Sequence, residues 1–219
     1  KNKDGNKYDV NLVKSEFQKP IKLIKGNWHP KNKLRNREVL LLSSGPKLND
    51  FKKEIEKFIT KNRPFVIALN THVKINKKFI DLHVACNPLK VLAEANKYKN
   101  IKSPLAVPVS LLSEQTRKKL KKIKILNFGI GLEGSSFNFF NSCSNIPKLY
   151  TVAYALSIVA SGKAKKIYLA GFDGYQKSDR RLKIVDEIFH VYSSTKGAPI
   201  VTAITPTMYN IQKKSIYTL

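Results

Sequence analysis

From Glu38 onward, short apolar runs alternate with longer amphipathic stretches, and this alternation restricts the possible folds more than any other feature of the chain. Short runs that are apolar at nearly every position indicate strands buried on both faces, whereas apolar residues at helical spacing indicate helices that cover a sheet. Strands and helices that take turns in this way form a parallel sheet between two helical layers. The sequence therefore predicts a three-layer α/β fold.

Seven apolar runs are expected to form a mostly parallel sheet of about seven strands: residues 39–42, 65–69, 82–86, 105–109, 123–126, 166–170 and 200–204. Five amphipathic or apolar stretches are expected to form helices: residues 50–60, 89–98, 112–122, 150–160 and 181–192. The segment 127–148 is rich in Gly, Ser, Asn and Phe and has little periodicity. A connection of that length inside a compact domain is typical of a functional or mobile loop.

The first 37 residues differ in character from the rest. They carry 11 basic and three acidic residues, include Pro20 and Pro30, and show no sustained apolar period. We expect residues 1–37 to be a basic N-terminal arm or linker and residues 38–219 to be the folded domain. The only methionine is Met208, so the sequence leaves open that this chain is part of a longer protein.

The chain is strongly basic, with 41 Lys and Arg against 15 Asp and Glu and a formal net charge of +26. Such a charge draws anionic partners, but only six of the basic residues are Arg, the better reader of phosphates and bases. The densest basic cluster, residues 117–124, is interpreted as the solvated face of a helix. Nucleic acid is therefore not the expected partner, although a generic polyanion-binding protein stays open as an alternative.

The expected compartment follows from what the sequence lacks. No apolar run approaches the roughly 18 residues needed to span a bilayer, and the N-terminal segment has no apolar core of a secretion signal. The two cysteines, Cys86 and Cys143, are too few for a disulfide framework and lack metal-ligand spacing. We expect a cytoplasmic protein without metal or cofactor, with peripheral association at the inner membrane as an open alternative.

The ends of the first three predicted strands carry the polar residues of a candidate site. Ligands of open parallel sheets bind at the carboxyl ends of the strands. The first strand runs into Gly45-Pro46 before a helix, where a glycine lets backbone approach a ligand and amide groups favour an anion. The next two strands end in Asn70-Thr71 and Asn87, whose amides can hydrogen-bond a nucleotide base or sugar. These residues are predicted to bind a nucleotide.

The later strand ends add further candidates. One strand ends in Gly171, Asp173 and Gly174, and the last one ends in Thr205. Asp173 is expected to contact the ligand, while an acidic turn that caps the following helix is the competing interpretation. His72 is the only histidine directly after a strand end and is therefore a weak candidate for a general base. No Ser-His-Asp order, metal motif or phosphate loop can be assembled, so the residues alone do not establish catalysis.

Three stretches together resemble known families: VLLLSSGPKLNDF, ACNP and IYLAGFDGY. In this order they look like the skeleton of the single-domain bacterial sialyltransferases of lipooligosaccharide synthesis and of related motility-accessory and pterin-diphosphokinase-like domains. The resemblance implies a Rossmann-like sheet that holds a CMP-sugar donor. It also implies donor-binding roles for Gly45, Pro46, Asn70 and Asn87.

The end of the chain carries a second resemblance, in GFDGY, TAITPT and KSIYTL. These motifs are similar to the C-terminal domain of 4-hydroxy-2-oxovalerate-aldolase-like proteins from surface-polysaccharide clusters, where an N-terminal barrel performs the aldol chemistry. We expect a nucleotide-sugar-binding domain, CMP-sugar-like, that acts as a sialyltransferase-like glycosyltransferase in polysaccharide biosynthesis. The alternative is a non-catalytic accessory domain of an aldolase-like enzyme. The expected partners are a nucleotide-sugar, an acidic glycan acceptor and an aldolase domain in the same chain.

Overall fold

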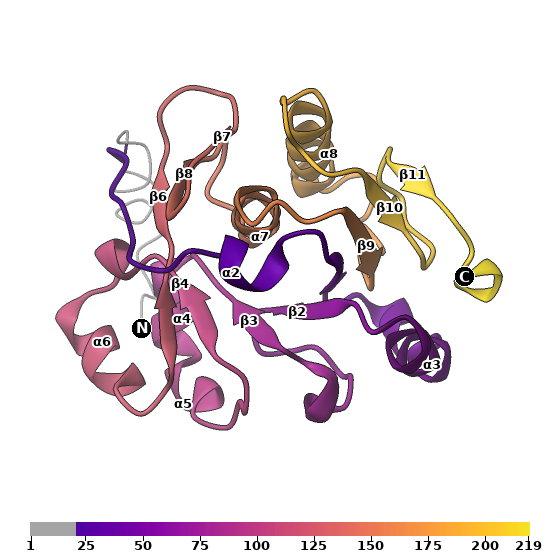
Figure 1. Ribbon diagram of the computed structural model, residues 1–219, viewed down its shortest axis with the longest axis horizontal. Helices are drawn as coiled ribbons and strands as arrows, with labels where there is room; N and C mark the ends of the chain where they lie inside the picture. The colour runs from indigo at the N-terminus through magenta and orange to yellow at the C-terminus, as the bar shows by residue number, and fades with distance from the viewer. Residues whose placement is uncertain (1–20) are drawn as a thin grey trace.

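The computed structural model describes residues 21–219, and residues 1–20 of the predicted arm lie outside the described residues. Its centre is an eight-stranded sheet in the order β11-β10-β9-β1-β2-β3-β4-β5, with every neighbouring pair parallel (Figure 1). The strands are β1 (Glu38–Leu42), β2 (Phe65–Leu69), β3 (Leu82–Val84), β4 (Leu105–Val107), β5 (Ile125–Asn127), β9 (Lys166–Ala170), β10 (Val201–Ala203) and β11 (Gln212–Lys213). The predicted three-layer, Rossmann-like α/β fold is confirmed.

The helices mostly follow the predicted positions. The α-helices are α2 (Lys31–Leu34), α3 (Lys52–Asn62), α4 (Pro88–Ala93), α5 (Ala95–Tyr98), α6 (Glu114–Leu120), α7 (Thr151–Ser161) and α8 (Arg180–Ser193). Short 3-10 helices are η1 (Pro46–Leu48), η2 (Lys77–Phe79), η3 (Val109–Leu111) and η4 (Ile216–Thr218). The single helix predicted over residues 89–98 is divided into α4 and α5 at Glu94, whose backbone leaves the helical region.

Two parts of the sheet structure were not predicted. The eighth strand, β11, has only two residues and both are exposed, so no apolar run indicates it. The predicted loop 127–148 contains a second sheet of three strands, β6 (Gly129–Gly131), β7 (Asn138–Phe139) and β8 (Cys143–Asn145), in the order β6-β8-β7. Its glycines and polar residues conceal the strands, because the two-residue alternation of apolar side chains is missing.

The two faces of the large sheet are covered by different helices. Along β1, Val39 and Leu41 pack in the cluster that contains α7 and α8, whereas Leu40 and Leu42 pack in the cluster that contains α3. This alternation follows from the pleat of a strand, which directs successive side chains to opposite faces. A strand buried on both faces must be apolar at nearly every position, so the strands of the large sheet correspond to continuous apolar runs in the sequence.

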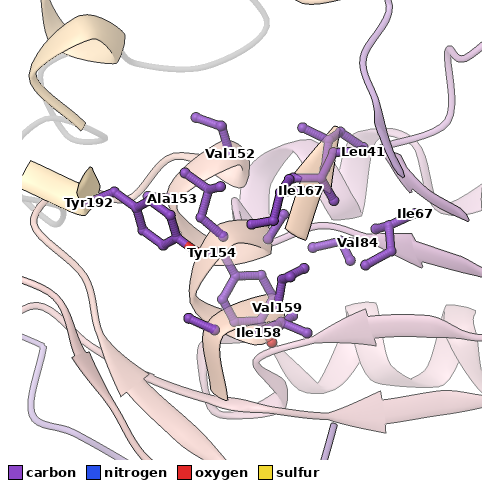
Figure 2. Packing of buried hydrophobic residues seen from close by; sticks show 14 of the residues in the cluster. Leu41, Ile67, Val84, Val152, Ala153, Tyr154, Ile158, Val159, Ile167 and Tyr192 are labelled. Atoms are coloured by element: carbon purple, nitrogen blue, oxygen red, sulfur yellow. The ribbon is translucent and has the colours of Figure 1, made fainter. Parts of the chain in front are cut away.

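Helix α7 lies at the centre of the larger cluster, where Figure 2 shows Tyr154 and Ile158 among side chains of the neighbouring strands. Ten of its 11 residues are buried, because apolar side chains occur all around the helix. The buried hydroxyl of Tyr154 donates a hydrogen bond of 2.6 Å to the carbonyl oxygen of Phe128. That bond satisfies the one strongly polar group of this side chain and ties α7 to the start of the small sheet.

Residues 21–37 of the predicted arm pack against the domain. The side chain of Leu34 is fully buried, and the ring of Trp28 packs edge-on against Phe128 with 6.4 Å between centroids. The amide of Gly26 donates to the carbonyl oxygen of Ser142 at 3.1 Å. Across residues 21–219, no helix combines the length and the apolar character needed to cross a membrane.

Candidate functional site

The order of the strands creates a switch point between β1 and β9. From β1 the chain adds β2 to β5 on one side, then returns through α7 to place β9 on the other side of β1. Successive crossovers therefore diverge at this position, which is where open α/β sheets bind ligands, outside the carboxyl ends of the strands. The loops that follow β1 and β9 contain Gly45 and Gly171, two of the predicted site residues.

These two loops are in direct contact. The amide of Gly45 donates to the carbonyl oxygen of Gly171 at 2.9 Å, and a Cβ added to Gly45 would lie 2.5 Å from the same oxygen. Gly171 has a φ of +72°, and its added Cβ would lie 2.5 Å from the carbonyl oxygen of Ser43. The hydroxyl of Thr205 accepts from the amide of Gly171 at 3.0 Å. The predicted residues Gly45, Gly171 and Thr205 therefore form one unit.

Asp173 connects the same two loops. One carboxylate oxygen accepts from the backbone amide of Lys47 at 2.6 Å, so this side chain is bonded to the start of η1. The other oxygen, Oδ1, is buried beside Gly45 and has no hydrogen-bond partner among the described residues. Helix α8 is capped instead by Asp179, so the competing interpretation of Asp173 as its cap is wrong. An unpaired buried oxygen of this kind requires an explanation, and a bound ligand or an ordered water would supply one.

The remaining residues of the two loops shape the turns. Pro46 begins η1, and the α-helix starts only at Lys52, so a 3-10 turn separates the loop from the helix. Gly174 has a φ of +101°, and a Cβ there would lie 2.8 Å from the Cβ of Met208. The amide of Met208 donates to the carbonyl oxygen of Asp173 at 2.9 Å. These contacts hold the segment after β9 against the segment after β10.

A second polar group follows β2. Asn70 has a φ of +59°, and its backbone amide donates to the carbonyl oxygen of Val84 at 2.9 Å. The hydroxyl of Thr71 donates to Oε2 of Glu94 at 2.7 Å, and Nε2 of His72 lies 2.9 Å from Oε1 of the same carboxylate. Glu94 was not predicted as a site residue, because no local pattern connects it with residues that precede it by more than 20 positions.

The electrostatics of this group keep Glu94 ionised. Burial by itself raises the pKa of the carboxyl, but the hydrogen bonds from Thr71 and His72 outweigh burial and bring the pKa below its usual value. The nearby ammonium of Lys90 acts in the same direction. The ring of His72 is engaged on its Nε2 atom, which also lies 3.3 Å from the ammonium of Lys97. The role of His72 as a general base stays a prediction, and the structure places the ring in an ionic network.

Asn87 lies at the end of the next strand and caps a helix. Its Oδ1 accepts from the amide of Lys90 at 3.1 Å, which leaves the amide nitrogen of the side chain for other contacts. The neighbouring Cys86 is buried, with its Sγ 3.9 Å from the hydroxyl of Thr151 at the start of α7. Burial raises the pKa of the Cys86 thiol to about 12, so this thiol is protonated and is not a nucleophile at neutral pH.

The starts of α7 and α8 carry a group that the sequence analysis did not single out, here called the Arg-Tyr cluster: Tyr150, Tyr175, Asp179, Arg180 and Arg181. The guanidinium of Arg181 lies 4.3 Å from the centre of the Tyr175 ring and forms an ion pair with Asp179. Burial and the Tyr175 hydroxyl raise the pKa of Tyr150, against the opposing effect of Arg180 and Arg181. Tyr175, Asp179 and Arg181 are therefore in direct contact, and Tyr150 and Arg180 lie within electrostatic range of them.

The position of this cluster follows from the direction of the helices. A helix that connects parallel strands runs antiparallel to them, so its N-terminus faces the carboxyl edge of the sheet. The partial positive charge of both helix starts adds to the charge of the two arginines. Two adjacent arginines are unusual in a chain that has only six, so the sequence itself indicates a candidate anion-binding position there. The sequence analysis did not single them out, because the many lysines made positive charge look unspecific. Within residues 21–219, no three His, Cys, Asp or Glu side chains gather where they could hold a metal ion.

Comparisons with known proteins agree with the fold. No family model matches the chain, and no curated protein matches it. Among solved structures, the chain is similar to the MAf glycosyltransferase from Magnetospirillum magneticum AMB-1, with a TM-score of 0.62 and 11% sequence identity. The similarity covers 93% of this chain and 37% of that protein, so the chain spans little more than a third of its length. The chain therefore shares its α/β fold with part of that protein, and the resemblances to sialyltransferases and aldolase-associated domains stay predictions.

Proposed function

We propose that this chain binds a nucleotide-sugar at the carboxyl edge of its large sheet, as a glycosyltransferase-like domain. The observation that carries the proposal is the switch point between β1 and β9, with its interlocked glycine loops, beside the Arg-Tyr cluster. The fold that the chain shares with a glycosyltransferase supports the same proposal, at the level of architecture.

The chemistry of the edge suits the parts of such a ligand. Arg180 offers a planar group that hydrogen-bonds phosphate oxygens in pairs, next to the positive start of α8. Arg181 already donates to Asp179 through Nε and Nη2, so its Nη1 is the atom that remains for the same ligand. The phenol groups of Tyr150 and Tyr175 can donate to the same oxygens. The free amide nitrogen of Asn87 suits a base or ribose acceptor. A net charge of +26 raises the local concentration of any anionic ligand.

The identity of the donor is a finer proposal. The resemblance of the segments after β1 and β9 to bacterial sialyltransferases implies a CMP-linked sugar, and a sialyltransferase-like reaction is the transfer that such a donor supports. A binding domain that serves a catalytic neighbour in the same chain is the second candidate, because the His72 ring is engaged by Glu94 and Lys97. Both candidates require the same nucleotide-sugar site.

The experiment is a thermal-shift series with CMP, CMP-sialic acid, UDP-sugars and GTP. A ligand at about 100 times its Kd stabilises the folded state by roughly 2.7 kcal/mol, which raises the Tm of a domain of this size by roughly 5–10 °C. Replacing the two arginines, Arg180→Ala and Arg181→Ala, is expected to weaken binding about tenfold or more. Arg117→Ala is the control for each single replacement, because it removes one charge and Arg117 is exposed on the distant helix α6.

The outcomes separate specific binding from general attraction. Specific binding predicts a Tm shift that depends on the nucleotide and survives Arg117→Ala. If no nucleotide raises the Tm, the proposal is wrong. Equal loss of the Tm shift in the control variant would contradict it as well, because that result indicates a generic response to positive charge.

A further inference from the structure

A separate hollow lies at the carboxyl ends of β10 and β11. Its volume is about 350 Å³, within the range of small-molecule sites. Six of its lining residues matter for the argument, and we call the space they line the β10–β11 hollow: Phe51, Thr205, Lys213, Lys214, Ser215 and Tyr217. Phe51 comes from the segment between η1 and α3, so the hollow is bounded by chain that follows β1 as well as by the last strands.

The aromatic side of the hollow presents an exposed ring on which a sugar can pack. Tyr217 is 71% exposed although its ring is large and apolar. Its ring packs against Phe51, with 6.3 Å between centroids and 54° between planes, so the two tilted rings do not form a parallel slot that would hold a nucleobase between them. An exposed aromatic ring beside a hollow can instead bury its free surface against the apolar face of a pyranose.

The other side of the hollow is positively charged. Lys213 and Lys214 are exposed, and neither has an ion-pair partner among the described residues. No carboxylate side chain is among the residues that line the hollow. The two hydroxyl groups of Thr205 and Ser215 add donors that suit sugar oxygens. The lining therefore combines an apolar platform with uncompensated positive charge.

We propose that the β10–β11 hollow binds an anionic sugar, a pyranose that carries a carboxylate or a phosphate, as a ligand separate from the nucleotide-sugar. The hollow adjoins the switch point, because the Thr205 hydroxyl that lines it also accepts from the amide of Gly171. The inference goes beyond the proposed function and shares only Thr205 with the switch point. It does not require that the Arg-Tyr cluster binds anything.

The test is a protein-observed NMR titration with three probes at millimolar concentration: 3′-sialyllactose, glucose 6-phosphate and uncharged lactose. Both charged sugars are expected to shift the amide signals of residues 205 and 213–217, and the stronger of the two identifies the carboxylate or the phosphate as the preferred charge. Lactose is expected to bind about fivefold more weakly or not at all, since one exposed ion pair is worth up to about that factor.

Variants test the aromatic part and the charged part of the hollow separately. Tyr217→Ala is expected to weaken the binding of both charged probes at least about fivefold. The double variant Lys213→Ala with Lys214→Ala is expected to remove the preference for charged sugars. The control is Lys119→Ala with Lys122→Ala, which removes the same charge at the opposite end of the sheet. All of these side chains are exposed, so the variants are expected to fold.

Each result decides the inference. Absence of shifts at the hollow, equal binding of lactose, or equal weakening by the control variant would overturn it. The Tm shift with CMP, which carries no acidic pyranose, is measured on the same variants and is expected to be unchanged. Binding of acidic sugar without any nucleotide response would reject the proposed function and leave this inference standing.

Discussion

Three glycine-to-alanine variants test the packing of the switch point, because the structure gives each glycine a different constraint. Gly197 has a φ of +82° and no atom within 4 Å of an added Cβ, so Gly197→Ala introduces backbone strain alone. Gly45 has a φ of −58°, but its Cβ would lie 2.5 Å from the carbonyl oxygen of Gly171, so Gly45→Ala introduces a clash alone. Gly171→Ala introduces both.

The magnitudes follow from these constraints. A left-handed conformation costs alanine about 1–2 kcal/mol, and the stiffer unfolded chain returns about 0.4–1 kcal/mol, so Gly197→Ala is expected to lose about 0–1.6 kcal/mol. Overpacking costs about 1–3 kcal/mol, and the same return leaves an expected loss of about 0–2.6 kcal/mol for Gly45→Ala. Gly171→Ala combines both costs with one return and is expected to lose about 1–4.6 kcal/mol.

The assay is urea denaturation followed by circular dichroism, with the free energy of unfolding extrapolated to water for each variant. The expected order of stability loss is Gly197→Ala, then Gly45→Ala, then Gly171→Ala. A loss below about 0.5 kcal/mol for Gly171→Ala would refute the close contact between the loops after β1 and β9, because that value is typical of an unconstrained surface position.

Three further predictions concern buried polar groups. Burial, with a smaller contribution from Lys77, lowers the pKa of His83 from 6.5 to about 4. Between pH 6.5 and about pH 4, His83 is therefore protonated in the unfolded chain but neutral in the native state. The contribution of His83 to the free energy of unfolding is complete above pH 6.5 and is lost as the pH falls to about 4. Urea titrations of the wild type and His83→Gln are expected to show free energies of unfolding whose difference changes by up to about 3 kcal/mol over this pH range. Parallel pH profiles of the two proteins would contradict the assignment. Tyr154→Phe leaves the carbonyl oxygen of Phe128 unpaired and is expected to lower the free energy of unfolding by about 1–3 kcal/mol in the same assay, whereas an unchanged value would refute the buried hydrogen bond. Because burial raises its pKa to about 12, Cys86 is expected to resist a disulfide reagent at pH 8 until the protein unfolds, and rapid labelling of the native protein would show that the thiol is accessible.

The fold could be predicted wherever burial leaves a local mark on the sequence. The run 65–69 is buried at all five positions and matches β2 residue for residue. Strand β11 leaves no such mark, because two exposed polar residues are compatible with any loop. The break at Glu94 is similarly hidden, since apolar residues continue through it at helical spacing.

The candidate site could be predicted in part for a related reason. The rule that ligands bind at the carboxyl ends of parallel strands led to Gly45 and Gly171, and the structure brings these two loops together. The partnership of Thr71 with Glu94 depends on how separate elements pack, which a single sequence does not encode locally. Arg180 and Arg181 were visible in the sequence, but were treated as part of the basic background.

The central claim is that a nucleotide-sugar binds at the switch point, and a crystal structure with CMP-sialic acid, or with whichever nucleotide gives the largest Tm shift, tests it most directly. The account predicts a ligand at the carboxyl ends of β1 and β9, with phosphate oxygens within hydrogen-bond distance of Arg180 or Arg181. A nucleotide bound at the opposite edge of the sheet, or in the β10–β11 hollow with the Arg-Tyr cluster untouched, would contradict it.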